Sequence, residues 1–278
     1  DVLNEIAFLT MDLEERGRAD YAHRLLNRYL EAKGEYRGLP LLAFYTVYRA
    51  LVRAKVAAIR ASQEHPASRL AELANCDRYL ACAVKATLPG KPTLMLMHGL
   101  AGSGKSWLAQ QLLERLGALR IRSDVERKRL FGLSALTRSD CAVGDGIYDT
   151  AATKATYDRL VESASHILAA GYPVLVDAAN LQAWQRAAFR DLAAARKVPF
   201  VILACTAPEA LLQARLVSRQ AAGCDASEAD YAVLTQQMRT QEALTLEEEA
   251  CCLGIDTTRP FPEDLPGRLL GIQIPSDH

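Results

Sequence analysis

A glycine-rich segment in the middle of the chain constrains its fold more than any other feature. Residues 99–106 read Gly-Leu-Ala-Gly-Ser-Gly-Lys-Ser and match the pattern G-x-x-x-x-G-K-[ST] without a gap. An apolar run over 93–97 precedes the segment, and leucines at helical spacing follow it as far as Leu116. A strand before and a helix after are the context in which this pattern forms a phosphate-binding loop. The sequence therefore predicts a P-loop protein built on a parallel α/β sheet.

The residue types in the loop suit the binding of a nucleoside triphosphate together with Mg²⁺. Glycines let the backbone turn its amides inward, and those amides form an anion cradle with the positive end of the following helix. We expect Lys105 to reach the β- and γ-phosphates and the Ser106 hydroxyl to ligate Mg²⁺. The alternative is an ordinary strand-to-helix turn with Lys105 in solvent. The predicted ATP-binding residues are Gly99, Leu100, Ala101, Gly102, Ser103, Gly104, Lys105, Ser106 and Trp107.

Composition narrows the classes of partner. The chain has 278 residues, half of them apolar, and its 33 basic residues equal its 33 acidic ones. Because the charges balance, we expect no overall positive electrostatic field that would attract membranes or a long nucleic acid. No apolar run approaches the roughly 20 residues of a membrane-spanning helix. The seven cysteines form no C-x-x-C pair, a pattern typical of free thiols in a reducing cytoplasm.

The order of patterns predicts three parts. Residues 1–66 carry apolar residues at helical spacing, and the break at 65–68 indicates a boundary. Residues 67–90 are expected to form a connecting helix and linker, ending in a cluster of proline and glycine. Residues 91–278 alternate strands and helices, as a parallel sheet requires. The expected fold class is thus a P-loop kinase-like α/β domain preceded by a small all-helical segment.

Two aspartates follow predicted strands. Strand ends of a parallel sheet point toward the ligand, so Asp124 after strand 118–122 is expected near the γ-phosphate. Its carboxylate could take the proton of an attacking hydroxyl, or merely complement a helix dipole. Asp177 follows the apolar part of the predicted strand 172–180 and is predicted to hold the Mg²⁺ shell, the alternatives being to orient Ser106 or to cap the next helix. Asn180 is the predicted N-cap of that helix, which covers residues 181–197.

The helical N-terminus resembles a known domain. Residues 4–14, 39–45 and 48–53 are similar to the final helices of an aminoglycoside-phosphotransferase-like domain, as found in bacterial two-part proteins where it precedes a P-loop ATP-binding domain. The part of that domain that holds its nucleotide loop and catalytic aspartates has no counterpart in this chain. The resemblance therefore implies no phosphotransferase chemistry in residues 1–66, and it implies a missing N-terminal part as a partner.

The P-loop region, over residues 91–258, also resembles a kinase group. A second strand ending in Ser123-Asp124, with Arg127 three residues later, is similar to polynucleotide kinases, zeta toxins and chloramphenicol phosphotransferases. The resemblance implies that Asp124 is the general base and that Arg127 helps to hold the acceptor. Arg186 matches a further arginine of the same pattern, which implies a substrate or phosphate role.

A helix after the fourth strand carries two further candidates. Arg215 and Arg219 look like the start of the arginine-bearing lid of P-loop kinases, which brings positive charge onto the transferring phosphate. Surface arginines without such a role are the alternative. The predicted turn of this lid covers 221–225, and a polar stretch over 134–146 that includes Asp140 is expected to cover the acceptor site.

These patterns together predict transfer of the ATP γ-phosphoryl group to a hydroxyl of a small molecule or nucleotide that the sequence does not identify. Two alternatives remain open at this stage. The domain could be an ATP-hydrolysing switch, in which Asp124 positions water, or a nucleotide-binding module with little turnover.

Overall fold

The chain folds into two compact units, Asp1–Gly90 and the residues from Lys91 onward. The computed structural model describes residues 1–63, 65–139, 144–222 and 225–271. This division coincides with the predicted start of the P-loop domain at residue 91, and no division lies at the other predicted boundary, near residue 66. The difference arises because the helix expected to be a connector packs along the helix before it and belongs to the first unit. No helix in the described part of the chain combines the length and the apolar character needed to cross a membrane.

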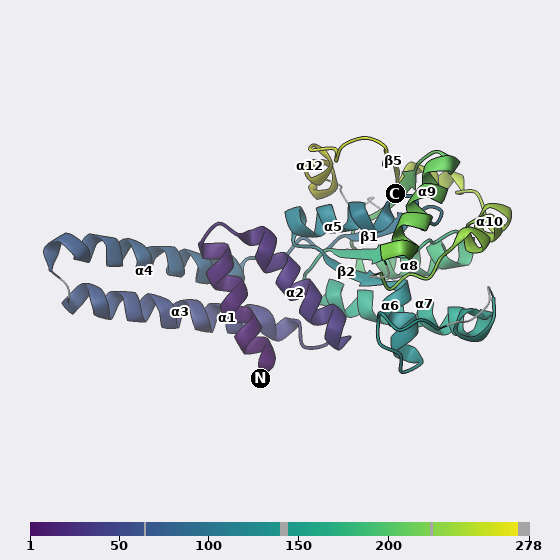
Figure 1. The fold of residues 1–278 in the computed structure, drawn as a ribbon. Helices are drawn as coiled ribbons and strands as arrows, with labels where there is room; N and C mark the ends of the chain where they lie inside the picture. The colour runs from purple at the N-terminus through teal and green to yellow at the C-terminus, as the bar shows by residue number, and fades with distance from the viewer. Residues whose placement is uncertain (64, 140–143, 223–224, 272–278) are drawn as a thin grey trace. The chain divides into compact units, whose positions relative to one another are not determined.

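The first unit is all helical. Its helices are α1 (Val2–Glu15), α2 (Ala19–Lys33), α3 (Pro40–Gln63) and α4 (Pro66–Thr87). Helices α3 and α4 lie side by side (Figure 1). Met11 packs with Tyr79 and with Ala50, Ala54 and Ala83 in a buried cluster. The small alanine side chains let the helices approach closely, because little volume separates their backbones.

The second unit contains a five-stranded sheet in the order β2-β3-β1-β4-β5, and every pair is parallel. The strands are β1 (Leu94–His98), β2 (Leu119–Arg122), β3 (Val174–Asp177), β4 (Phe200–Thr206) and β5 (Cys252–Asp256). Central strands are apolar along their length because helices cover both faces of the sheet. The central strand β1 runs directly into the glycine-rich segment, which places that segment at the carboxyl edge of the sheet.

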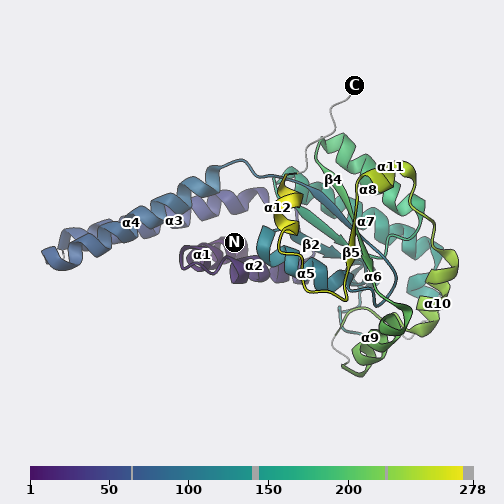
Figure 2. The ribbon, with the colours of Figure 1, turned by 90° about the horizontal axis from the view of Figure 1, so that it is seen from above.

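Helices flank the sheet on both faces (Figure 2). One face packs against α5 (Lys105–Leu116) and α12 (Leu265–Leu270), and the other against α7 (Thr150–Ala169) and α8 (Ala183–Arg196). The remaining elements are α6 (Ser123–Leu130), the 3₁₀ helix η1 (Gly146–Tyr148), α9 (Glu209–Ala222), α10 (Tyr231–Thr240) and α11 (Leu246–Ala250). The predicted fold class, a parallel α/β sheet flanked by helices and preceded by an all-helical segment, is confirmed.

One predicted helix start is wrong. Asn180 has a positive φ of 50° and does not cap α8. Its side-chain amide instead donates to the carbonyl of Met97 at 2.6 Å, which ties the residues after β3 to the end of β1. Helix α8 begins at Ala183, where Gln182 and Gln185 form a capping box. Within the two loops expected to cover the site, Asp140 and the lid-turn positions 223 and 224 lie outside the described residues.

Candidate active site

The glycines of the loop are required by tertiary contacts as well as by backbone angles. Gly99 and Gly104 have φ values of +137° and +88°, which L side chains rarely adopt. A Cβ atom on Gly99 would lie 2.5 Å from the carbonyl oxygen of Cys205, and one on Gly104 would lie 2.9 Å from the Cβ of Thr257. Strand β4 and the residue that follows β5 therefore pack so closely against the loop that neither glycine has room for a side chain.

The donors of the loop that are expected to bind phosphate form hydrogen bonds to oxygen atoms of the protein itself. The Nζ atom of Lys105 donates to the carbonyls of Gly99 at 2.8 Å and Leu100 at 2.7 Å. Burial lowers the pKa of Lys105. The backbone amide of Ala101 donates to Oε1 of Gln237 at 2.7 Å. Gln237 comes from α10, and no motif in the sequence indicated that it reaches the loop.

The two residues predicted to hold Mg²⁺, Ser106 and Asp177, contact each other, as they also would if Asp177 only oriented Ser106. The Ser106 hydroxyl donates to Oδ1 of Asp177 at 3.2 Å. The other carboxylate oxygen is buried and has no hydrogen-bond partner among the described residues, although Nε of Arg122 lies 3.7 Å away. Mg²⁺ is typically held by one or two protein oxygens together with phosphates and waters, so this pair fits that ion. The described residues contain no cluster of three or more His, Cys, Asp or Glu side chains for a metal.

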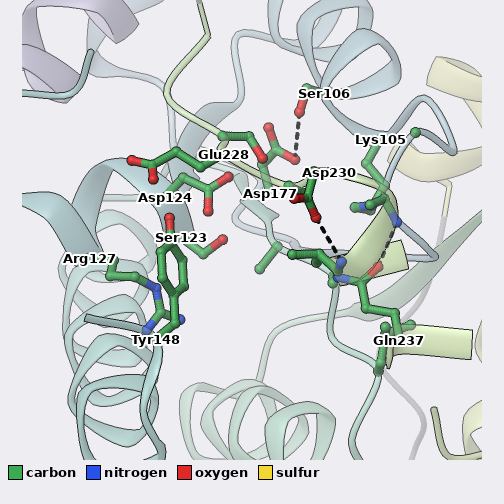
Figure 3. A pocket seen from close by; sticks show the side chains of 18 of the residues that line it. Lys105, Ser106, Ser123, Asp124, Arg127, Tyr148, Asp177, Glu228, Asp230 and Gln237 are labelled. Carbon is green, nitrogen blue, oxygen red and sulfur yellow. Dashed lines mark hydrogen bonds between the residues drawn. The ribbon is translucent and has the colours of Figure 1, made fainter. Parts of the chain in front are cut away.

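A cavity of about 550 Å³ brings most of the predicted site residues together. Figure 3 shows Lys105 and Gln237 on one side and Asp124, Arg127 and Tyr148 on the other. The predicted residues that line the cavity are Ala101, Gly102, Gly104, Lys105, Ser106, Trp107, Asp124, Arg127, Asp177, Arg215 and Arg219. Of the other predicted residues, Gly99, Leu100, Ser103 and Arg186 are not among the lining.

The side of the cavity formed by α6 and η1 holds the predicted base. Asp124 lies in the first turn of α6. Nη1 of Arg127 donates to the carbonyl of Ile147 at 2.7 Å and to the Thr153 hydroxyl at 3.2 Å. The Arg127 guanidinium also lies over the ring of Tyr148, 5.0 Å from its centroid. Burial, and next the charge of Asp124, raise the pKa of the Tyr148 phenol, so it stays protonated and can donate a hydrogen bond.

The two arginines of α9 differ in their contacts. Nη1 of Arg215 donates to the carbonyl of Gly102 at 3.2 Å and to the Thr257 hydroxyl at 2.9 Å, and Nη2 donates to the Thr257 carbonyl at 2.8 Å. Arg219 donates to the carbonyl of Ala229 at 2.8 Å. Both residues line the cavity. Arg215 also joins the phosphate loop to the residues that follow β5.

The substrate role implied for Arg186 is not supported. Its side chain is fully buried. Nε pairs with Glu248 at 2.8 Å, and the other guanidinium nitrogens donate to the carbonyls of Asn180, Glu242 and Ala243. This network holds α8 against the segment around α11, so Arg186 is a structural residue. Its sequence position could not show this, because its ion-pair partner lies 62 residues later in the chain.

Glu228 is a lining residue that the sequence did not indicate. It pairs with Lys128 at 2.8 Å and accepts hydrogen bonds from the backbone and the hydroxyl of Ser139. Glu228 and Asp124 both line the cavity (Figure 3). Glu228 belongs to the segment between α9 and α10, which has no motif, and its position depends on the packing of that segment over α6.

A glycine-rich loop between β1 and α5, at the carboxyl edge of a parallel sheet, defines this chain as a P-loop protein. The family model described as AAA domain matches residues 94–244, from the first residue of β1 to the segment after α10. The chain therefore belongs to this AAA domain family.

Similar proteins include curated relatives from mycobacteria. Uncharacterized proteins of Mycobacterium bovis and Mycobacterium tuberculosis are each 33% identical over 227 residues, which is 82% of this chain and 45% of the relative. The chain thus spans less than half the length of these relatives. Among solved structures, a gluconokinase from Sinorhizobium meliloti is 19% identical, with a TM-score of 0.43, and the match covers 65% of this chain and 90% of that one. The APS kinase CysC of M. tuberculosis is 20% identical, with a TM-score of 0.47 and coverage of 66% and 97%.

Proposed function

We propose that the P-loop unit is a kinase that transfers the γ-phosphoryl group of Mg·ATP to a hydroxyl of a small molecule. One observation carries this proposal. The carboxylate of Asp124 lines the same cavity as the phosphate-loop residues Lys105 and Ser106. A P-loop by itself accounts only for nucleotide binding. A carboxylate in the same cavity adds the general base that can take the proton of an acceptor hydroxyl.

The nucleotide end of the cavity would hold the triphosphate. Lys105 would exchange its bonds to loop carbonyls for bonds to the β- and γ-phosphates. Ser106 and Asp177 would hold Mg²⁺, directly and through water, and Mg²⁺ when bound neutralises charge on the β- and γ-phosphate oxygens. Arg219 would add positive charge near the transferring group. These groups stabilise charge that develops as the phosphoryl group moves.

Asp124 would act on the acceptor. Its carboxylate takes the proton of the acceptor hydroxyl as that oxygen bonds to the γ-phosphorus, and the bond from the γ-phosphorus to the bridging oxygen breaks to release ADP. General-base catalysis of this kind contributes roughly 10²- to 10⁴-fold to a rate. Tyr148 can donate a hydrogen bond to the acceptor from the same side of the cavity.

The test is an Asp124→Asn variant assayed with γ-labelled Mg·ATP. The panel of acceptors contains aminoglycosides, nucleosides and 5′-hydroxyl oligonucleotides, and Lys105→Ala provides the blank. A kinase should lose about 10²-fold or more of its transfer rate while its ATP affinity is unchanged. Hydrolysis of ATP that no acceptor alters would favour a switch, and binding without turnover would favour a nucleotide-binding module.

We assign no reaction to the first unit. Residues 1–66 resemble the final helices of an aminoglycoside-phosphotransferase-like domain, and two ion pairs join α1 to α3 through Glu5 with Arg49 and Asp12 with Arg53. The phenol of Tyr79 on α4 also donates to Asp12. Because Arg49 and Arg53 are paired with carboxylates of the same unit, we infer that they stabilise the packing of α1 on α3.

A further inference from the structure

Arg122, the last residue of β2, contacts two carboxylates from different parts of the P-loop unit. Its Nε atom lies 3.7 Å from Oδ2 of Asp177, and its Nη2 atom donates to Oδ1 of Asp225 at 2.6 Å. Arg122 and Asp177 are register partners in the parallel pair of β2 and β3, so the sheet itself holds them side by side. Asp225 lies between α9 and α10 and lines the cavity. Arg122 therefore joins the candidate Mg²⁺ site to the segment that follows α9.

The contact with Asp177 is the longer of the two, and it involves an oxygen atom that a metal ion can use. Oδ1 of Asp177 accepts from Ser106 (Figure 3), whereas Oδ2 is buried and accepts no hydrogen bond from any described residue. A buried oxygen of this kind is costly unless a ligand or a cation satisfies it. The Arg122 side chain is 14% exposed, so water screens its charge only weakly. A cation this close to the carboxylate opposes the binding of Mg²⁺ there.

The contact with Asp225 fixes a segment that reaches the phosphate end of the cavity. Oδ1 of Asp225 accepts a second hydrogen bond, from the backbone amide of Ser227 at 3.0 Å. Two residues further on, the carbonyl of Ala229 accepts from Arg219. The ion pair between Arg122 and Asp225 thus helps to hold the carbonyl that positions Arg219.

We propose, resting on the Mg²⁺ site of the kinase function above, that Arg122 is a positioning residue that couples Mg²⁺ binding at Asp177 to the segment of Asp225. Without Mg²⁺, Arg122 shares its charge between the two carboxylates. Mg²⁺ at Asp177 repels the guanidinium, which strengthens the pair with Asp225 and fixes the segment that holds Arg219. Coupling between two sites is reciprocal, so an intact pair with Asp225 favours Mg²⁺ by keeping the guanidinium away from the metal ligand.

The experiment compares the dissociation constant of ATP in EDTA with that in excess MgCl₂, both measured by calorimetry. The ratio of the first constant to the second reports how much Mg²⁺ strengthens nucleotide binding. Arg122→Met should raise this ratio on the order of tenfold, because the competing cation is gone. Asp225→Asn should lower it, because Arg122 is released toward Asp177. Thermal unfolding checks that each variant is folded, and Arg122→Gln takes the place of Arg122→Met if the latter does not fold.

The double variant Arg122→Met/Asp225→Asn decides whether Asp225 acts through Arg122. If it does, the double variant has the raised ratio of Arg122→Met, because no guanidinium remains to be released. A ratio near that of the wild type, as the product of the two single effects gives, would show that each charge acts on the site by itself and would overturn the proposal. An unchanged ratio in either single variant would also overturn it.

Failure of the underlying function gives a different result. Equal dissociation constants of ATP with and without MgCl₂ in the wild type would refute the Mg²⁺ site and with it the role of Arg122. Absence of transfer to any acceptor in the γ-labelled assay, with the predicted ratios in the variants, would refute the kinase reaction and leave the coupling through Arg122 intact.

Discussion

Arg215 should support the stability of the P-loop unit as well as any reaction that occurs in it. Its guanidinium makes three hydrogen bonds, one to Gly102 in the phosphate loop and two to Thr257 after β5. Hydrogen bonds to charged groups contribute about 1.5–3 kcal/mol each when buried. Arg215 is only partly buried, so water replaces part of this contribution, and we expect Arg215→Met to cost about 2 kcal/mol. For a unit of this size, that corresponds to a fall in Tm of about 4–8 °C.

The assay is thermal unfolding followed by tryptophan fluorescence. Both tryptophans, Trp107 and Trp184, lie in the P-loop unit, so the signal reports this unit and not the helical one. The matched control is Arg219→Met, which removes the same charge from the same helix but only one hydrogen bond, to Ala229. Melting of Arg215→Met at the wild-type temperature, or an equal fall for both variants, would refute the assignment of Arg215 as the residue that joins the loop to β5.

Three further predictions concern backbone, charge and pH. Gly104→Ala should abolish ATP binding in calorimetry, because the new Cβ would lie 2.9 Å from Thr257 in a backbone region of φ +88°. Arg186→Met should lower the free energy of unfolding in urea by about 3–5 kcal/mol, because it leaves Glu248 as a buried carboxylate without its partner. Burial lowers the pKa of His98 below its usual 6.5, so the unfolded chain binds a proton that the folded chain does not. Stability should therefore fall as pH decreases below about 6.5, and His98→Gln should reduce this loss when urea unfolding is compared at about pH 7.5 and about pH 5.5.

Each of these has a control. Gly132→Ala also places an alanine at positive φ, +69°, but its Cβ would meet nothing within 4 Å, so it should bind ATP normally. The double variant Arg186→Met/Glu248→Met should recover much of the lost stability, because no buried charge remains unpaired. If the wild type and His98→Gln lose the same free energy of unfolding between the two pH values, then protonation of His98 does not cause the loss.

The phosphate loop was predictable because its determinants are local. Strand, turn and helix follow one another within residues 93–116, and the glycines and Lys105 occupy positions that the pattern fixes. The same reasoning placed Asp124 and Asp177 at strand ends, where both now line the cavity. Parallel strands bring their carboxyl ends to one edge, so a residue after a strand is located by topology alone.

Contacts between distant segments could not be predicted in this way. Gln237 contacts Ala101 across 136 residues, and Thr257 contacts Ser103 across 154. Arg186 had the sequence context of a substrate ligand, but packing of α8 buries it against Glu248. The chemistry of a side chain is visible in a sequence, whereas its partner is decided by the tertiary fold.

The hydrogen bonds within the phosphate loop also determine what a measured nucleotide affinity would mean. Lys105 and the amide of Ala101 already donate to oxygens of the protein, so a phosphate must compete with those oxygens. The free energy of nucleotide binding is then the difference between the bonds that these donors form with phosphate and the bonds that they form with the protein. A change at Gln237, on a different helix from the loop, can tune this difference without altering the loop's own residues. Natural variants could adjust nucleotide affinity through α10 while the glycine-rich sequence stays the same.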